Sequence, residues 1–350
     1  MNSLNITNSS LPIDDIVDLL KRHCVMTPEE IDAIALWITA SYLINSFRVF
    51  PKLALISPEK RCGKSTTMEV IESVAKDSVL LSSISSAGIY RVTQQGQPTL
   101  LIDEADTFVK DGSPDLIGII NSSHSKKGST VIRCAGDDHK AKAFNTWMPM
   151  VLASIGALSD TVMDRSIVIN LRRKKPQEHV ARIPVDLEDQ QATLRDALSS
   201  WCSSYEAAIK SSTAVVPNLG NDRAMDNWFP LYVIAEALGN SWPARCEAAY
   251  KALTTPAEPE LPTLLLKAIS VYFSSTGVSR ISSSELTTEL CKDETGPWRE
   301  CNNGRCVTQN QVARLLRNYG IKPSSMRVGE SVIRGYDKAD FTDAFERYIP

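Results

Sequence analysis

The stretch from Ser57 to Thr66 constrains this chain most, because its Gly-Lys-Ser-Thr core at 63–66 has the pattern of a phosphate-binding loop. A short apolar run at 52–56 precedes it and predicts a buried strand, and the residues after it predict a helix. In that setting the backbone N–H groups of the loop surround phosphate oxygens. Pro58 replaces the usual first glycine, so the first turn must differ from the standard loop. Taken alone, the pattern also fits an ordinary strand, turn and helix.

Each position of this loop has an expected role in holding a nucleotide. Lys64 would reach the β- and γ-phosphates, and the Ser65 hydroxyl would hold Mg²⁺. The expected nucleotide-binding residues are Pro58, Glu59, Lys60, Arg61, Cys62, Gly63, Lys64, Ser65 and Thr66.

A second motif, which is acidic, follows about forty residues later, where the hydrophobic strand expected at 99–103 ends in Asp103 and Glu104. A carboxylate at the carboxyl end of a buried strand is suited to support Mg²⁺, so Asp103 is the expected metal residue. Glu104 can polarise the attacking water as a general base. Alone, the pair also fits a solvated strand end. Together with the loop it predicts a nucleoside-triphosphatase site that uses ATP and Mg²⁺.

Length, charge and cysteines limit the remaining possibilities. A chain of 350 residues has room for two or three domains, and its net charge of −3 gives no global attraction to nucleic acid. Eight scattered cysteines without a signal peptide fit a reducing cytoplasm. The apolar run at 31–44 is too short and interrupted for a membrane span. Cys291, Cys301 and Cys306 suggest zinc, but the lack of a C-x-x-C pair and of any histidine after His179 argues against it.

The pattern of the first half is α/β. Thr27, Pro28 and Glu30 predict a helix start with a capping box. Strands are expected at 52–57, 77–82, 99–103, 148–154 and 166–171. Helices are expected at 187–209, 224–238 and 242–253, with Trp228 and Trp242 in their core. The expected domains are an N-terminal helical segment at 1–47, an ATPase core at 48–175, a helical lid at 176–256 and a C-terminal domain at 257–350.

Residues 129–144 predict a β-hairpin, because apolar residues alternate on both sides of a Gly-Asp-Asp turn. Its tip carries the basic residues His139, Lys140 and Lys142, which we expect to contact DNA. The alternative is a plain solvated turn.

The C-terminal region, after a linker at 254–262, predicts several helices followed by two strands. The helices are expected at 263–275, 283–291, 308–319 and from 338, and the strands at 324–328 and 331–336, an order typical of a winged helix. Between residues 299 and 338, eight Lys/Arg face three Asp/Glu, a local charge of +5. Such a surface suits DNA phosphates or, alternatively, another protein. The residues expected to bind DNA are Arg314, Arg317, Arg327 and Arg334.

Four stretches together carry a family resemblance: residues 57–66, 99–106, 151–171 and 221–231. The core resembles AAA+-type P-loop ATPases, close to the compact helicases of viruses and mobile elements. The whole chain resembles primase-associated ATPases of bacteria, phages and plasmids. The resemblance implies an AAA+-like core with a parallel sheet and a hairpin before the fourth strand, a helical lid and a winged-helix-like domain.

The resemblance also implies further site residues. Ser154 matches the sensor-1 position, which orients the lytic water, and Arg223 is the candidate for sensor 2. Arg165 matches the arginine finger that reaches a neighbouring subunit's γ-phosphate, which requires an oligomer and leads to the hypothesis of a ring. Arg172 and Arg173 are the alternatives, and a salt bridge with Asp164 or Asp160 is the other reading of Arg165. His124 is expected to be a capping or surface histidine.

The resulting prediction is an oligomeric ATP-hydrolysing DNA translocase or helicase that serves replication of a phage or mobile element. Its substrate would be single-stranded or forked DNA, and a primase-polymerase partner would be a separate chain. The alternative is a nucleotide-switched DNA-binding initiator, loader or antiphage-defence ATPase without unwinding. A small-molecule kinase ranks last, because the lid and the C-terminal domain would have no use in it.

Overall fold

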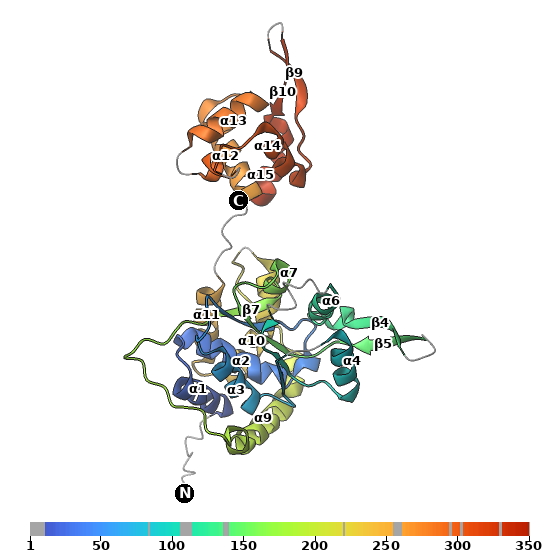
Figure 1. Cartoon of the computed structure of the whole chain (residues 1–350), viewed down its shortest axis with the longest axis vertical. Coiled ribbons are helices and arrows are strands. Elements are labelled where there is room, and N and C mark those ends of the chain that lie inside the picture. The colour runs from blue at the N-terminus through green and yellow to red at the C-terminus, as the bar shows by residue number, and fades with distance from the viewer. Residues whose placement is uncertain are drawn as a thin grey trace, which may run out of the picture. The chain divides into compact units, whose positions relative to one another are not determined.

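The computed structural model describes residues 11–82, 85–105, 114–135, 140–219, 221–254, 261–293, 296–301, 304–328 and 331–349. The chain divides into two compact units, Met1–Thr255 and Pro256–Pro350. Figure 1 shows both units.

The first unit begins with two helices, α1 (Pro12–His23) and α2 (Pro28–Ser41). The predicted capping box at the start of α2 is confirmed. The Glu30 N–H donates to the Thr27 hydroxyl at 3.3 Å, and the Thr27 N–H donates to the Glu30 carboxylate at 2.8 Å. These bonds satisfy two N–H groups that would otherwise lack partners at the helix start.

A five-stranded parallel sheet forms the centre of the first unit, which confirms a mixed α/β fold. Its order is β2-β3-β6-β1-β7, and every neighbouring pair is parallel. The strands are β1 (Lys52–Ser57), β2 (Val79–Leu81), β3 (Leu100–Ile102), β6 (Met150–Ile155) and β7 (Ser166–Asn170). All six residues of β1 are buried, as expected for a central strand covered on both faces.

Helices cover both faces of this sheet (Figure 1). Leu53 and Leu55 of β1 belong to a core shared with α1, α2, α3 (Lys64–Val74) and the later helices. Ala54 and Ile56 point to the opposite face, because side chains alternate along a strand. That face packs against α4 (Ser86–Gln95), α6 (Pro114–Ser122) and α7 (Asp160–Met163).

The expected hairpin is present as β4 (Thr130–Ala135) and β5 (Lys140–Asn145), which pair antiparallel. Its predicted tip residue His139 lies outside the described residues. Two short 3₁₀ helices complete this part, η1 (Ile44–Ser46) and η2 (Lys126–Gly128).

The single helix predicted at 187–209 is wrong, because the structure has two helices there. These are α8 (Leu187–Gln190) and α9 (Ala192–Lys210), and Gln191 between them has φ −92° and ψ 3°. That backbone conformation lies outside the helical region and interrupts the i→i−4 bonding pattern. Two more helices follow, α10 (Asp222–Leu238) and α11 (Trp242–Leu253). Trp228 and Trp242 are buried in this core, as predicted.

The second unit combines helices with a three-stranded antiparallel sheet of order β8-β10-β9. The strands are β8 (Arg280–Ser282), β9 (Ser324–Val328) and β10 (Ser331–Asp337). The sequence did not predict β8, which has only three residues. The helical elements are α12 (Leu261–Thr276), α13 (Ser283–Lys292), η3 (Pro297–Arg299), α14 (Gln309–Leu316), η4 (Arg317–Tyr319), η5 (Lys338–Phe341) and α15 (Thr342–Tyr348).

The linker predicted at 254–262 extends too far, because α12 already begins at Leu261. Proline is tolerated in the first turn of a helix, where its missing N–H has no partner to lose, so Pro262 does not prevent this start. Gly335 in β10 allows a close approach of the strands: a Cβ there would lie 2.3 Å from the Ile281 carbonyl oxygen. Trp298, Phe273 and Phe341 lie in the core of this unit.

Candidate functional site

The loop at 58–63 connects the carboxyl end of β1 to the start of α3. Gly63 is the N-cap of α3 with φ +82°, and Arg61 also has a positive φ of +66°. No side chain caps this helix start. Its first N–H groups, together with the positive end of the helix dipole, therefore form a favourable place for an anion. Pro58 is exposed at the beginning of the loop.

Lys64 bonds to Ser57, the first residue of the 57–66 stretch, for which the sequence predicted no role. Its Nζ donates to the Ser57 hydroxyl at 2.6 Å, and that hydroxyl donates to the Glu59 carbonyl oxygen at 2.9 Å. Ser57 is the last residue of β1 and is fully buried. A small polar residue at the end of an apolar strand is the only sequence signal for it.

The two carboxylates lie in the same cavity as the loop. A cavity of about 550 Å³, the loop cavity, is lined by residues 60–66, Asp103, Glu104 and Ile155. The loop and the two carboxylates come together because the sheet is parallel, so the carboxyl ends of β1 and β3 lie at the same edge of the sheet. Glu104 has a left-handed φ of +51°, and its N–H donates to Asp103 Oδ1 at 2.8 Å. The chain thus turns sharply immediately after β3, and both acidic residues line the cavity.

Ser154 lies near the end of β6, the strand between β1 and β3. It is opposite Ile56 in the register, is fully buried, and donates its hydroxyl to the Gly156 carbonyl oxygen at 2.8 Å. Its neighbour Ile155 lines the loop cavity, whereas Ser154 does not. The hydroxyl therefore bonds to its own chain in this structure.

Two of the candidate arginines lie near the turn that follows α7. Arg165 donates from Nη1 to the Thr161 carbonyl oxygen at 2.7 Å. Arg223 of α10 pairs with Asp164 at 3.2 Å. Asp164, one of the two partners considered for Arg165, thus pairs with Arg223 instead.

The other two arginines contact their own chain. Arg173 pairs with Glu59 at 3.1 Å and donates to the Lys60 carbonyl oxygen at 3.3 Å, so it braces the loop at 58–63. Arg172 pairs with the buried carboxylate of Glu30 at 3.7 Å.

A buried polar network reaches the turn that follows α7. It shows that His124, which was expected to be a capping or surface histidine, is a buried residue instead. This histidine is buried, and its Nε2 lies 2.7 Å from Asn227 Oδ1. Asn227 in turn donates to the Asp164 carbonyl oxygen at 3.1 Å. Burial lowers the pKa of His124 from 6.5 to about 4, and the charges of Lys52 and Arg165 add to this shift. No sequence pattern signals this contact, since 103 residues separate its partners.

Lys52 is also buried, at the opposite end of β1 from the loop. Its Nζ has no hydrogen-bond partner among the described residues, and its backbone N–H donates to the Arg165 carbonyl oxygen at 3.0 Å. Burial, and then the charge of Arg165, lower the pKa of Lys52. This shift has the direction that burial of an amine without a hydrogen-bond partner produces.

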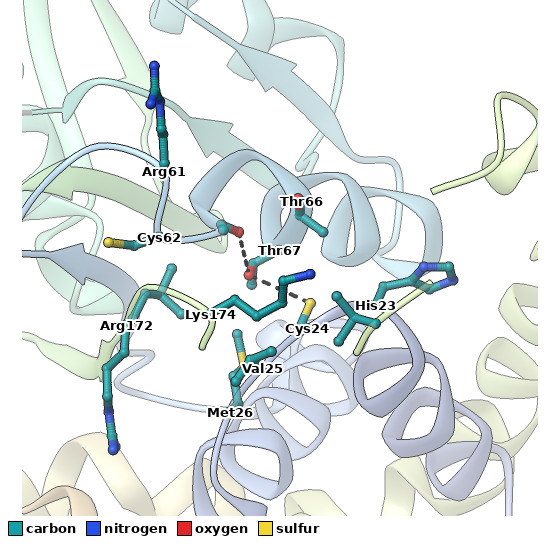
Figure 2. Close-up of a pocket in the computed structure, with 13 residues that line it drawn as sticks. His23, Cys24, Val25, Met26, Arg61, Cys62, Thr66, Thr67, Arg172 and Lys174 are labelled. Carbon is teal, nitrogen blue, oxygen red and sulfur yellow. Dashed lines mark hydrogen bonds between the residues drawn. The ribbon is translucent and has the colours of Figure 1, made fainter. Parts of the chain in front are cut away.

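A second cavity of about 320 Å³, the α1 cavity, adjoins the loop. It shares Arg61, Cys62, Gly63 and Thr66 with the loop cavity. Its other walls come from the end of α1 and the residues that follow it, from Thr67 of α3, and from the segment after β7: His23, Cys24, Val25, Met26, Thr67, Leu171, Arg172, Lys174 and Val180. Figure 2 shows the Lys174 side chain extending across this cavity, while Arg61 and Arg172 point away from it. The Thr67 hydroxyl connects two walls of this cavity. It lies 2.9 Å from the Gly63 carbonyl oxygen and 3.7 Å from the Cys24 sulfur, both within hydrogen-bonding distance.

The residues predicted to bind DNA lie on exposed elements of the two units. Lys142 of β5 is exposed, with its Nζ 5.5 Å from the centre of the Phe144 ring. Lys140 begins β5, and its side chain lies outside the described residues. In the second unit the register places Arg327 and Arg334 on one face of the β9–β10 hairpin. The exposed basic residues of this unit include Arg314, Arg317, Arg327 and Arg334.

Among the helices in the described ranges, none has both the length and the apolar character needed to cross a membrane.

Several known proteins and structures are similar to this chain in sequence or in fold. A 28.9 kDa protein of Saccharopolyspora erythraea, described as lying in the xis 5′ region, is 28% identical over 186 residues, which cover 51% of this chain and 69% of the relative. The structure of the NrS-1 C terminal region in its A form aligns with a TM-score of 0.47 at 10% identity, covering 93% of this chain and 75% of that one. Residues 170–348, just over half of the chain, match the family described as "Protein of unknown function (DUF3631)". The chain therefore belongs to the DUF3631 family.

Proposed function

We propose that the first unit binds and hydrolyses ATP with Mg²⁺ at the loop cavity, and that the chain uses this turnover to move along or unwind DNA. One observation carries the first part. Lys64 and Ser65 line a single cavity together with Asp103 and Glu104, beside a helix start that no side chain caps. Cationic, hydroxyl and carboxylate groups in this arrangement match what triphosphate hydrolysis requires.

The roles follow from the contacts. Lys64 would leave the Ser57 hydroxyl for a phosphate oxygen, and the N–H groups at the start of α3 would bind the phosphates. The Ser65 hydroxyl and the Asp103 carboxylate are oxygen ligands of the kind Mg²⁺ prefers, so they fit the ion, which would neutralise charge on the phosphates when bound. Glu104 would accept a proton from the attacking water.

The α1 cavity suits the base of the nucleotide. It adjoins the loop, so a base there and phosphates in the loop cavity can belong to one ligand. Its walls are rich in apolar and sulfur-containing side chains, including Val25, Met26 and Leu171, which favour a flat ring over water.

The family resemblance supplies the finer part of the proposal: an AAA+-like core, a helical lid and an oligomeric ring. Arg165 is the favoured residue for contacting a neighbouring subunit. Arg172 and Arg173 already pair with Glu30 and Glu59 of their own chain, whereas Arg165 bonds to a backbone oxygen at the end of a short helix. The exchange of a carbonyl partner for a phosphate would cost little.

Exposed basic residues on hairpins of both units support the DNA part. Lys142 lies on the β4–β5 hairpin, and Arg327 and Arg334 share a face of the β9–β10 hairpin. The second unit has the helix and strand order of a winged-helix-like domain, which we propose as its role.

The first experiment tests nucleotide use. Lys64→Ala should abolish ATP turnover and weaken binding of a fluorescent ATP analogue, because the ammonium facing the phosphates is lost. Lys210→Ala is the matched control, since Lys210 is an exposed lysine that pairs with Glu206. Full ATP turnover by Lys64→Ala would refute the proposed site.

The second experiment tests DNA. Single-stranded DNA should raise the ATPase rate of the wild type, and Lys142→Ala should lose this stimulation while keeping its basal rate. In the second unit, Arg327→Ala combined with Arg334→Ala should weaken DNA binding and flatten its salt dependence, whereas Arg347→Ala, whose guanidinium pairs with Asp343, should not. DNA binding that depends on nucleotide, without unwinding of a fork, would instead support a nucleotide-switched initiator or loader.

A further inference from the structure

The peptide between Lys60 and Arg61 has a strained conformation in the middle of the loop at 58–63. Arg61 has a left-handed φ of +66°, in a region that favours glycine and that a long side chain occupies at a cost. Figure 2 shows the Arg61 side chain pointing away from the α1 cavity. Rotation of this peptide by half a turn would return the φ of Arg61 to negative values and release the strain. Contacts with the rest of the protein must therefore hold the peptide in place.

The guanidinium of Arg173 makes such a contact. Its Nη2 donates to the Lys60 carbonyl oxygen at 3.3 Å and pairs with the Glu59 carboxylate at 3.1 Å. The Cys62 thiol is a second donor to the same carbonyl oxygen, at 3.9 Å, but a thiol donates weakly. A hydrogen bond from a charged donor is stronger, so Arg173 provides the main resistance to rotation of the peptide.

The parallel sheet brings Arg173 to the loop. β7 pairs with β1, and where the two strands end the Leu171 N–H donates to the Ile56 carbonyl oxygen at 2.7 Å. The segment after β7 therefore leaves the sheet beside the loop, and Arg173 is the second residue after Leu171. Arg173 lines neither the loop cavity nor the α1 cavity, so it can affect a ligand there only through the loop.

Other carbonyl oxygens of the loop are also bound by donors of the protein. The Glu59 carbonyl oxygen accepts from the Ser57 hydroxyl at 2.9 Å. The Gly63 carbonyl oxygen accepts from the Thr67 N–H and from the Thr67 hydroxyl, both at 2.9 Å. Carbonyl oxygens repel phosphate oxygens, whereas backbone N–H groups attract them. A loop that binds phosphates therefore needs its carbonyl oxygens held away from the ligand.

The bond from Arg173 also determines the direction of the Arg61 N–H. In a planar trans peptide the N–H and the C=O point in opposite directions. Because the Lys60 carbonyl oxygen points to Arg173, the N–H of Arg61 points away from Arg173. Rotation of the peptide would exchange the two groups, and a carbonyl oxygen would then replace a donor of the loop.

We propose that Arg173 is a positioning residue for the nucleotide, because it holds the 60–61 peptide in the strained orientation that offers the Arg61 N–H to the phosphates. The inference rests on the proposed ATP site in the loop cavity. Arg173 acts within its own chain and supports affinity, whereas an arginine that reaches a neighbouring subunit would support the chemical step. Without Arg173 the peptide rotates, because nothing of comparable strength opposes the release of strain at Arg61.

Steady-state kinetics separate these two roles. Arg173→Ala should raise the KM for ATP about tenfold and leave kcat within about twofold of the wild type, because rotation of the peptide weakens binding but removes no group from the reacting phosphate. Arg182→Ala is the control, since Arg182 is an exposed arginine of the same segment, and it should keep both values. A fall in kcat at unchanged KM would overturn the proposal.

The variant Arg61→Gly gives a measurement that a merely structural role of Arg173 would not affect. Glycine adopts a positive φ without the penalty of a side chain, so the strain that drives the rotation is absent. In this background Arg173→Ala should raise the KM only about twofold. An equal rise in both backgrounds would contradict the proposal, because Arg173 would then not act against strain at residue 61.

Limited proteolysis without nucleotide distinguishes this inference from the ATP site itself. Trypsin cleaves after Lys60 and Arg61, which are both exposed, and Arg173→Ala should accelerate this cleavage several-fold relative to Arg182→Ala. If the wild type binds no ATP and Arg173→Ala still accelerates cleavage, the proposed function fails while Arg173 is confirmed as the contact that holds the loop. Cleavage of Arg173→Ala at the wild-type rate would overturn the inference whether or not ATP binds.

Discussion

The buried imidazole of His124 should make the free energy of unfolding depend on pH. His124 is buried against Asn227, and its pKa of about 4 lies below its ordinary value of 6.5. Burial is the largest cause, and the charges of Lys52, Arg165 and Arg223 act in the same direction. The hydrogen bond to Asn227 acts in the opposite direction and does not offset them.

The direction of this pH effect follows from the pKa of His124 in the two states. In the unfolded chain His124 takes up a proton near its ordinary pKa of 6.5, whereas in the folded protein it does so only near pH 4. Between these values, acid therefore favours the unfolded chain. Proton linkage therefore lowers the free energy of unfolding by at most about 2 kcal/mol when the pH falls from about 7 to about 5. Solvent screening should reduce it to about 1–2 kcal/mol.

Urea unfolding followed by tryptophan fluorescence at both pH values measures this effect. His124→Gln keeps a side-chain N–H for Asn227 but does not titrate, so its free energy of unfolding should fall about 1–2 kcal/mol less than that of the wild type. His179→Gln changes an exposed histidine and should follow the wild type. If His124→Gln loses as much stability as the wild type between the two pH values, the reasoning about the buried imidazole is wrong.

Three further outcomes are expected. Gly63→Ala should cost about 1–2 kcal/mol in unfolding free energy because of its φ of +82°, although a Cβ would meet no atom within 4 Å; unchanged urea unfolding would contradict this. Trp242→Ala should cost the first unit about 3–5 kcal/mol, since it empties a core site and removes the contact with Arg245, and the calorimetric transition of the second unit should stay where it is. Chelation of divalent ions should stop ATP turnover in a coupled assay and excess Mg²⁺ should restore it, while turnover that persists in EDTA would exclude the metal role of Ser65 and Asp103.

Elements with a local cause could be predicted from the sequence. The capping box needs only Thr27 and Glu30, three positions apart, and a buried parallel strand such as β1 is recognisable as a continuous apolar run. The β4–β5 hairpin follows from alternation around a turn. The meeting of Asp103 with the loop also follows from a general rule, since parallel strands end at the same edge.

Contacts made by tertiary packing could not be predicted. His124 bonds to Asn227 across 103 residues, and nothing near either residue indicates the other. The break at Gln191 depends on a single backbone conformation within a sequence that otherwise favours a helix.

The Ser57 hydroxyl gives Lys64 a hydrogen-bond partner before any ligand arrives. Because Lys64 already has a partner at 2.6 Å, a phosphate gains only the difference between the two bonds. A charged phosphate oxygen is a stronger acceptor for an ammonium than a hydroxyl is, so an anionic ligand would still draw the lysine away. If the loop binds a triphosphate as proposed, Ser57 would hold Lys64 at the edge of the loop cavity until the ligand arrives.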